Sequence, residues 1–253
     1  MDKIFAGKSV MVTGASSGIG QAVAHAFRSN GARVAAIGRN KVALDELYVA
    51  DNHVLRIAAD VTDSDAMRRA VEDVITAFGS LDVLVNAAGH ISSGTIENTE
   101  PAAWDALMNV NLRAPFRLMQ LCTPHLIETK GSIVNVSSVT GLRSFPGVLA
   151  YCVSKAGLDQ LTRCAALELA AKGVRVNAVN PGVVVTEIHK RGGMDEEGYA
   201  KFLEHSRTTH PLGRVGSPSE IADLVLFLAS EKASWITGAT YSIDGGRALT
   251  CAR

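Results

Sequence analysis

Thr13-Gly14-Ala15-Ser16-Ser17-Gly18-Ile19-Gly20 is the stretch that decides the fold. It follows the apolar run 9–12, which we expect to be a strand, and it opens the run 19–30, which we expect to be a helix. Its glycines allow a tight turn and a close backbone approach, and the helix N-terminus then offers free N–H groups to a pyrophosphate. The spacing is G-x-x-x-G-x-G rather than the commoner G-x-G-x-x-G. The stretch therefore predicts a phosphate-binding turn.

Apolar runs and helical patterns alternate on the C-terminal side of this turn. Further strands are expected at 33–37, 53–58, 81–85, 133–136 and 174–179, and a helix is expected at 63–78. Alternation without hairpin signals predicts an α/β fold, a Rossmann-like doubly wound parallel sheet with helices on both faces. Because no repeat or low-complexity linker interrupts the pattern, residues 1–253 are expected to form a single dinucleotide-binding catalytic domain. The polar, glycine-containing segment 187–213 predicts a mobile substrate lid with few apolar anchors.

Composition excludes several classes of partner. The 25 Lys and Arg residues balance 25 Asp and Glu residues without a basic tract, so nucleic acid is not expected as a partner. No apolar run approaches the length of about 18 residues that a membrane helix needs. The first residues do not resemble a signal peptide, and we expect a cytoplasmic protein without a membrane partner. Four scattered cysteines give no close pair, and no metal site is expected.

The same turn also fits another reaction class. Gly14, Ser16 and Gly18 match G-x-S-x-G, the nucleophile-elbow pattern of α/β hydrolases. A serine hydrolase would need an acidic residue and a histidine later in the chain, and no histidine stands in a motif context. This alternative is therefore the weaker one.

The decisive chemical signal is Ser138 followed by Tyr151-Cys152-Val153-Ser154-Lys155. Tyr151 and Lys155 are four residues apart, so on a helix they share one face. Ser138 follows the expected strand 133–136, at the carboxyl end where such sheets bind ligands. Y-x-x-x-K alone is a trivial pattern, but behind a phosphate-binding turn and with this serine upstream it indicates proton-transfer chemistry.

The chain resembles the short-chain dehydrogenase/reductase family, in its single-domain branch, and in particular the members that reduce 3-oxoacyl carrier-protein or small carbonyl substrates. The motifs that carry the resemblance span the chain: 13–20, Asp60-Val61, 86–89, Val110-Asn111-Leu112, Ser138, Tyr151 with Lys155, Asn180-Pro181-Gly182 with Thr186, 211–214 and 244–246. The resemblance implies a catalytic tetrad of Asn111, Ser138, Tyr151 and Lys155. It also implies that Asp60 and Val61 meet the adenine, that Asn86 steadies the sheet, and that 181–186 flanks the nicotinamide.

Two groups of residues are expected around the ligands. The cofactor residues are Gly14, Ser16, Ser17, Gly18, Ile19, Gly20, Gly38, Arg39, Asn40, Asp60, Val61, Asn86, Ala87, Gly89, Tyr151, Lys155, Pro181, Gly182, Val184 and Thr186. The substrate residues are His90, Ser138, Thr140, Phe145, Val148 and Val183, with Leu142, Ile188 and His189 as further pocket positions.

The chemistry asks for these residues independently of the resemblance. Hydride delivery to a carbonyl builds negative charge on oxygen, so a proton must arrive. For Tyr151 to work near pH 7, its pKa must fall from about 10 toward about 7. The Lys155 ammonium, together with the positive charge of the oxidised nicotinamide, is expected to cause this fall by stabilising the phenolate. A catalytically inactive dinucleotide sensor is a further alternative, although it would not need all four catalytic residues.

The cofactor expected is NADP. Gly38 is expected at the end of the second strand, where NAD-specific sites carry a carboxylate that binds the ribose 2′-hydroxyl. Arg39 follows, and its planar guanidinium suits a phosphate. The second basic residue that many NADP-binding relatives carry before the middle glycine is absent, because Ser17 occupies that position. A NAD-dependent alcohol dehydrogenase stays as the alternative.

A homotetramer, or at least a dimer, is also expected. Between 150 and 171, 14 of 22 residues are apolar or aromatic, which indicates a helix with more than one apolar face. A fully buried helix within one chain is the other explanation.

Overall fold

A seven-stranded parallel sheet forms the centre of the molecule, in a computed structural model that describes residues 3–49 and 51–250. The strand order is β3-β2-β1-β4-β5-β6-β7, and all six pairings are parallel. The strands are β1 (Ser9–Thr13), β2 (Arg33–Gly38), β3 (Val54–Ala58), β4 (Val83–Asn86), β5 (Ser132–Val136), β6 (Arg175–Pro181) and β7 (Thr240–Ile243). The expected doubly wound α/β fold is confirmed. β7 is the one strand for which no range was predicted.

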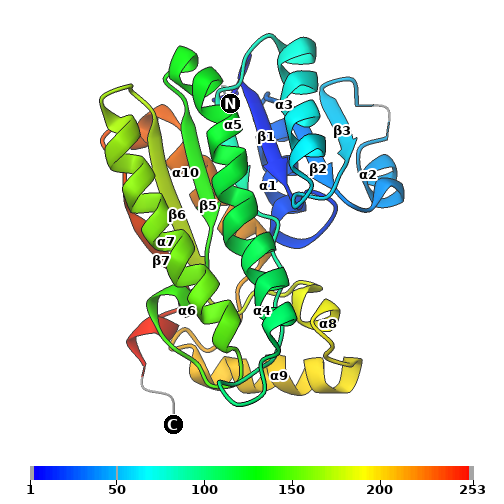
Figure 1. Ribbon diagram of the computed structural model, residues 1–253, viewed down its shortest axis with the longest axis vertical. Helices are drawn as coiled ribbons and strands as arrows, with labels where there is room; N and C mark the ends of the chain where they lie inside the picture. Colours follow the sequence, from blue (N-terminus) through cyan, green and yellow to red (C-terminus); the bar gives the residue numbers. More distant parts are fainter. Residues whose placement is uncertain (1–2, 50, 251–253) are drawn as a thin grey trace.

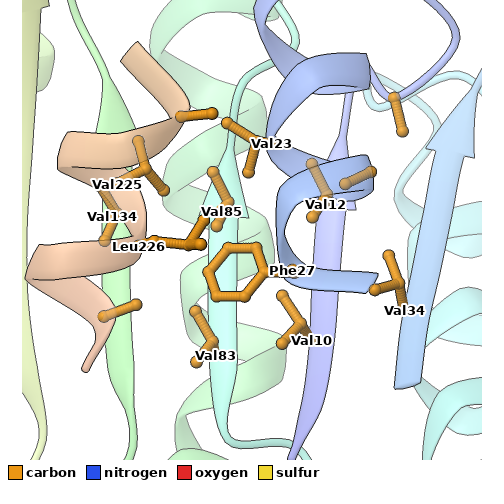
Figure 2. Close-up of a cluster of buried hydrophobic side chains, with 14 of the residues drawn as sticks. Val10, Val12, Val23, Phe27, Val34, Val83, Val85, Val134, Val225 and Leu226 are labelled. Carbon is orange, nitrogen blue, oxygen red and sulfur yellow. The ribbon is translucent and has the colours of Figure 1, made fainter. Parts of the chain in front are cut away.

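Helices cover both faces of this sheet (Figure 1). Alternate strand residues point to opposite faces, so Val10 and Val12 join the cluster under α1 (Gly18–Ser29) and α10 (Pro218–Ala229). Figure 2 shows Phe27 of α1 in the middle of that cluster, between the valines of the strands and Leu226 of α10. The opposite face carries α3 (Ser64–Phe78), α5 (Ala114–Thr129) and α7 (Leu149–Ala170).

The order of the strands in the sheet indicates where a binding crevice lies. From β1 the chain proceeds to β2 and β3 on one side and then returns to β4 on the other side. At such a switch point the connections leave in opposite directions, which opens a crevice beyond the carboxyl ends of the two strands. The turn 13–20 follows β1 and therefore lies at this crevice.

Shorter elements gather around the same end of the sheet. They are α2 (Lys41–Leu47), α4 (Pro101–Met108), the π-helical segment η1 (Asn109–Arg113), α6 (Val139–Leu142), α8 (Ile188–Arg191), α9 (Glu196–Thr209) and the 3-10 turn η3 (Arg247–Leu249). The 3-10 turn η2 (Glu231–Ala233) lies at the opposite end of the sheet, near the start of β6. Figure 1 shows α8 and α9 below the carboxyl ends of the strands. Among the described residues, no helix is long and apolar enough to cross a bilayer.

The segment 187–213 is more ordered than its polar sequence predicts. Most of it is helical, and the Tyr199 hydroxyl donates a 2.9 Å hydrogen bond to the carbonyl of Thr186. The buried His210 accepts a hydrogen bond of 3.1 Å from the backbone N–H of Val183. Few apolar side chains anchor this segment, as its sequence predicts, and polar contacts hold it instead. Its mobility as a lid stays a prediction.

Candidate active site

A cavity of about 850 Å³ lies at the carboxyl ends of the central strands. Every cofactor and substrate residue expected from the sequence lines it, apart from Asn86, Asn111 and the further position Leu142. Asn86 is buried below the cavity and donates a 2.8 Å hydrogen bond to Asn135 on the neighbouring strand, so it ties β4 to β5. Leu142 is partly exposed and does not line the cavity.

The turn after β1 is shaped for a phosphate. Gly14 has a positive φ of 70°, and a β-carbon there would lie 2.9 Å from both the Ala87 carbonyl and the Ala88 nitrogen. Thr13 Oγ1 accepts 3.0 Å hydrogen bonds from the backbone N–H groups of both alanines, which fixes the loop after β4 against the turn. No side chain caps α1 at Ser17 in the described structure. The first N–H groups of α1 therefore face the cavity as donors for an anion.

The end of β2 forms the second part of the cavity. A β-carbon on Gly38 would meet the Ser16 hydroxyl at 2.8 Å, so this strand end admits no larger side chain without movement. Arg39 is largely exposed, and its guanidinium lies 3.9 Å from the Asp60 carboxylate. Burial pushes the pKa of Asp60 upward, but hydrogen bonds from Thr62 and the charge of Arg39 outweigh it, so this pKa is lowered. Together with the glycine cradle, these residues fit an adenine dinucleotide.

Ser138, Tyr151 and Lys155 meet at the third part of the cavity, and all three are buried. Ser138 caps α6, where its hydroxyl accepts a 3.1 Å hydrogen bond from Thr140 N–H. Lys155 Nζ donates a 2.9 Å hydrogen bond to the Val136 carbonyl and lies 5.7 Å from the centre of the Tyr151 ring. The helix α7 thus brings an acid and a cation to the serine at the end of β5.

The pKa of Tyr151 lies above its ordinary value in this structure, and the fall expected from Lys155 together with an oxidised nicotinamide stays a prediction. Burial raises the pKa of Tyr151 to about 12, although a hydrogen bond with Ser138 acts in the opposite direction. Burial also lowers the pKa of Lys155 to about 8, against the charge of Asp159. The reason is that both groups leave water together, which disfavours the charged form of each. At neutral pH this site holds a protonated phenol beside an ammonium.

Asn111 lies in a local break of the helix that joins α4 to α5. The break is the π-helical segment η1, and Asn111 is fully buried within it. Its Oδ1 accepts a 2.9 Å hydrogen bond from His90 N–H, and its Nδ2 donates to the His90 carbonyl at 2.8 Å. A β-carbon on Gly89 would lie 3.6 Å from Asn111 Oδ1 and 3.7 Å from Lys155 Nζ, so the two groups flank this glycine. Asn109, two residues earlier in the same segment, is partly exposed.

Several cavity residues were missed by the sequence analysis. They come from α9, from α8 and from the C-terminal turn η3, and they are Phe202, His205, Ser206, Thr209, Arg191 and Arg247. The Arg247 guanidinium carbon lies 5.0 Å from the centre of the Phe145 ring. No local motif marks these residues, because they reach the cavity only through the path of the chain after β6. Arg143 does not line the cavity and donates a 2.6 Å hydrogen bond to the carbonyl of Ala248.

The chain is similar to known proteins over almost its whole length. Residues 14–248 match a family model described as Enoyl-(Acyl carrier protein) reductase. The chain is 41% identical over 249 residues to a 3-oxoacyl-[acyl-carrier-protein] reductase of Thermotoga maritima, covering 95% of this chain and 97% of the relative. It is 36% identical over 246 residues to the 2,5-dichloro-2,5-cyclohexadiene-1,4-diol dehydrogenase of Sphingobium indicum, covering 95% and 96%.

Solved structures agree with this similarity. A short-chain dehydrogenase/reductase of unknown function from Caenorhabditis elegans, solved with cofactor, superposes with a TM-score of 0.92 at 36% identity and covers 98% of this chain and 97% of its own. The 3-ketoacyl-(acyl-carrier-protein) reductase of Brucella melitensis, complexed with NADH, gives a TM-score of 0.87 at 30% identity, covering 96% and 99%.

Proposed function

The chain belongs to the short-chain dehydrogenase/reductase family, and on this premise we propose that it transfers a hydride between NADP(H) and a carbonyl or secondary alcohol, with Tyr151 as the proton-transfer residue. Family membership makes the protein an oxidoreductase. The observation that carries the finer proposal is the meeting of Ser138, Tyr151 and Lys155 at one end of a cavity whose other end is a phosphate cradle.

A reduced nicotinamide held in this cavity would supply the hydride to the substrate carbon and would become oxidised. As negative charge builds on the substrate oxygen, the Tyr151 phenol gives it a proton, and the product is the alcohol. Ser138 donates a hydrogen bond to the same oxygen and orients it. The Lys155 ammonium stabilises the phenolate that Tyr151 leaves behind. Because burial raises the Tyr151 pKa to about 12, the acid form that reduction requires is the one present at neutral pH.

Asn111 has a positioning role in this proposal. Its amide is held by His90 and Ser154, with a 3.1 Å hydrogen bond to the Ser154 hydroxyl, so it cannot turn freely. Since it flanks Gly89 together with Lys155 Nζ, a water held there would connect Lys155 to solvent and return a proton to Tyr151.

NADP is the proposed cofactor, with NAD as the alternative. Support for NADP is the absence of a carboxylate at Gly38 and the guanidinium of Arg39 next to it. Support for NAD is the nearness of Asp60, which competes for Arg39, and the NADH bound by the Brucella relative. A phosphate dianion would outcompete a single carboxylate 3.9 Å away, since it offers more charge and more acceptor oxygens.

The substrate is proposed to be a small molecule with a carbonyl or secondary alcohol group. The substrate end of the cavity combines apolar residues such as Phe145 and Val148 with polar ones such as Thr140 and His90. One relative acts on a 3-oxoacyl group and another on a cyclic diol. A panel of ketones, diketones, ketoses and 3-oxoacyl thioesters with both cofactors separates these classes.

Tyr151→Phe is the experiment that tests the mechanism. The variant should fold and bind cofactor as the wild type does, but its turnover should fall by about 10²- to 10⁴-fold, because general acid catalysis is lost. Tyr241→Phe on β7 removes a phenol that does not line the cavity and serves as the matched control. Near wild-type turnover of Tyr151→Phe contradicts the mechanism, and a wild type that binds cofactor but turns over no substrate favours the sensor.

We also propose a homotetramer, or at least a dimer. The helices α5 and α7 cover the same face of the sheet, and they leave Phe116 41%, Val153 39% and Leu167 82% exposed. Apolar surface of this kind is stabilised by burial against a second copy. Light scattering should give a multiple of the 26.6 kDa chain mass. Leu167→Glu should lower that mass, whereas Val42→Glu on α2 should not, and a monomeric wild type refutes the assembly.

A further inference from the structure

The short helix α8 rests on the phosphate-binding turn. Arg191, its last residue, donates a 2.8 Å hydrogen bond from Nη2 to the Ser17 hydroxyl, across 174 positions of sequence. At the start of the same segment, Thr186 lies so close to Gly18 that a β-carbon on this glycine would be 3.3 Å from the threonine methyl group. Thr186 and Arg191 therefore contact two successive residues of the turn, Gly18 and Ser17.

The charge of Arg191 is directed at this turn without an acidic partner. Among the salt bridges of the described residues, none involves Arg191. Its neighbour Lys190 is in the opposite situation, because its Nζ lies 2.8 Å from Glu196 and 3.5 Å from Glu187. One of the two adjacent cations is therefore neutralised on the lid, while the other is free to meet an anion in the cavity.

A second cation lies near the same place. Burial lowers the pKa of His90 first, and the charges of Arg39 and Arg191 lower it further, so both guanidinium groups act on one histidine of the cavity wall. Asp60 is the single acidic residue among the cavity residues described. Two arginines from distant segments and a single carboxylate make this end of the cavity attractive to an anion with several charges.

We propose that Arg191 binds a phosphate group of the dinucleotide and thereby couples closure of the 187–213 segment to cofactor binding. Arg191 replaces, from the lid, the basic side chain that Ser17 does not provide in the turn itself. The inference depends on the proposed cofactor class. The ligand chemistry is a phosphate, either the ribose 2′-phosphate or the pyrophosphate, and the two sources give different results below.

The physical basis is an exchange of one hydrogen-bond partner for a stronger one. The Ser17 hydroxyl is a neutral acceptor, whereas a phosphate oxygen is charged and can take both prongs of the guanidinium fork. A charge-assisted contact of this kind changes affinity by about 10- to 100-fold. Because Arg191 lies on the lid, the gain in affinity is available only when the lid rests on the turn.

The test is nucleotide binding, measured as Kd by fluorescence or calorimetry and not as activity. Arg191→Ala should weaken binding of adenosine 2′,5′-bisphosphate and NADPH by about 10- to 100-fold, and Arg191→Lys should recover part of the loss. Loss for NADPH alone identifies the 2′-phosphate, and equal loss for NADPH and NADH identifies the pyrophosphate. Lys190→Ala is the matched control, since it removes the same charge from the adjacent position, and it should leave each Kd within about twofold.

Hydrogen exchange tests the coupling. Adenosine 2′,5′-bisphosphate or NADPH should slow amide exchange in 187–213 of the wild type and of Lys190→Ala, but much less in Arg191→Ala at saturating ligand. Unchanged Kd values for Arg191→Ala overturn the inference while leaving the proposed function intact. A wild type that binds neither NADPH nor NADH overturns both. Equal protection of the segment in Arg191→Ala and wild type overturns the coupling.

Discussion

Asn180 Nδ2 donates a 2.8 Å hydrogen bond to Asp159 Oδ2, and this bond joins the end of β6 to the helix that carries Tyr151 and Lys155. Both residues are buried, and Asn180 Nδ2 also donates to the Ser138 carbonyl at 2.9 Å. Burial raises the pKa of Asp159, while Ser137, Asn180, Arg163 and Lys155 act in the opposite direction. A buried carboxyl one turn beyond Lys155 thus links three segments of the site.

Asp159→Asn should alter the pH dependence of reduction. The Asp159 charge raises the pKa of Lys155, so its removal lowers that pKa and the loss of activity at alkaline pH begins earlier. The measurement is kcat/KM for reduction as a function of pH, with Asp223→Asn on the exposed side of α10 as the control. An unchanged profile would mean that Asp159 is only structural. Asp159→Leu should cost about 1–3 kcal/mol of stability, because Asn180 loses its acceptor.

The two reaction directions should respond to pH with opposite signs. Reduction needs the Tyr151 phenol and the Lys155 ammonium, so its kcat/KM should be constant below the Lys155 pKa of about 8 and fall above it. Oxidation needs the phenolate beside the ammonium, so its rate should rise with pH up to about 8 and then level off. Reduction that stays constant far above this pH contradicts the assignment of Lys155.

Arg39→Ala should remove the preference for NADPH. The guanidinium is the basic group that follows β2, and loss of its contact with a phosphate should lower kcat/KM with NADPH by about 10- to 100-fold. The same value with NADH should change little, because the ribose hydroxyl carries no charge. Both cofactors are compared with one common substrate. Equal or better use of NADH by the wild type refutes the NADP assignment.

Gly141→Ala should disturb the site from a position outside the catalytic tetrad. A β-carbon on Gly141 would lie 2.9 Å from the Lys155 carbonyl oxygen and would also strike the Asp159 carboxylate, so α6 must move away from α7. Overpacking of this kind costs about 1–3 kcal/mol, and each kcal/mol lowers Tm by roughly 2–4 °C in a chain of this size. We expect a lower Tm together with a lower kcat, because Ser138 caps α6.

Gly216→Ala is the matched control for that variant. Its φ is not positive, and a β-carbon there meets Val184 at an ordinary 3.4 Å. It should leave Tm and kcat close to the wild-type values. Equal effects of the two substitutions would show that the contact between Gly141 and α7 has no special importance.

The local sequence pattern was sufficient to predict the strands of the sheet, except β7, and most of the residues that line the cavity. Strands buried on both faces appear as short apolar runs, and residues that follow their carboxyl ends gather at one edge, so the order of runs along the chain is enough to put Ser138 beside a dinucleotide turn. The spacing of Tyr151 and Lys155 on one helix required nothing beyond helical periodicity. The weak strand β7 was missed because its residues, of which none is fully buried, do not form an apolar run.

Other properties depended on residues that are distant in sequence. The effect of burial on the pKa of Tyr151 depends on what packs around the phenol, and a sequence motif does not contain that information. The contacts of Arg191 with Ser17 and of Asp159 with Asn180 join segments 174 and 21 positions apart, so no spacing rule could have found them. The sequence by itself determined the fold and the candidates for the reacting groups, because strand runs and helical spacing are local patterns. The tertiary structure alone decided their protonation and the charges that face the cofactor, since these depend on burial and on distances through space.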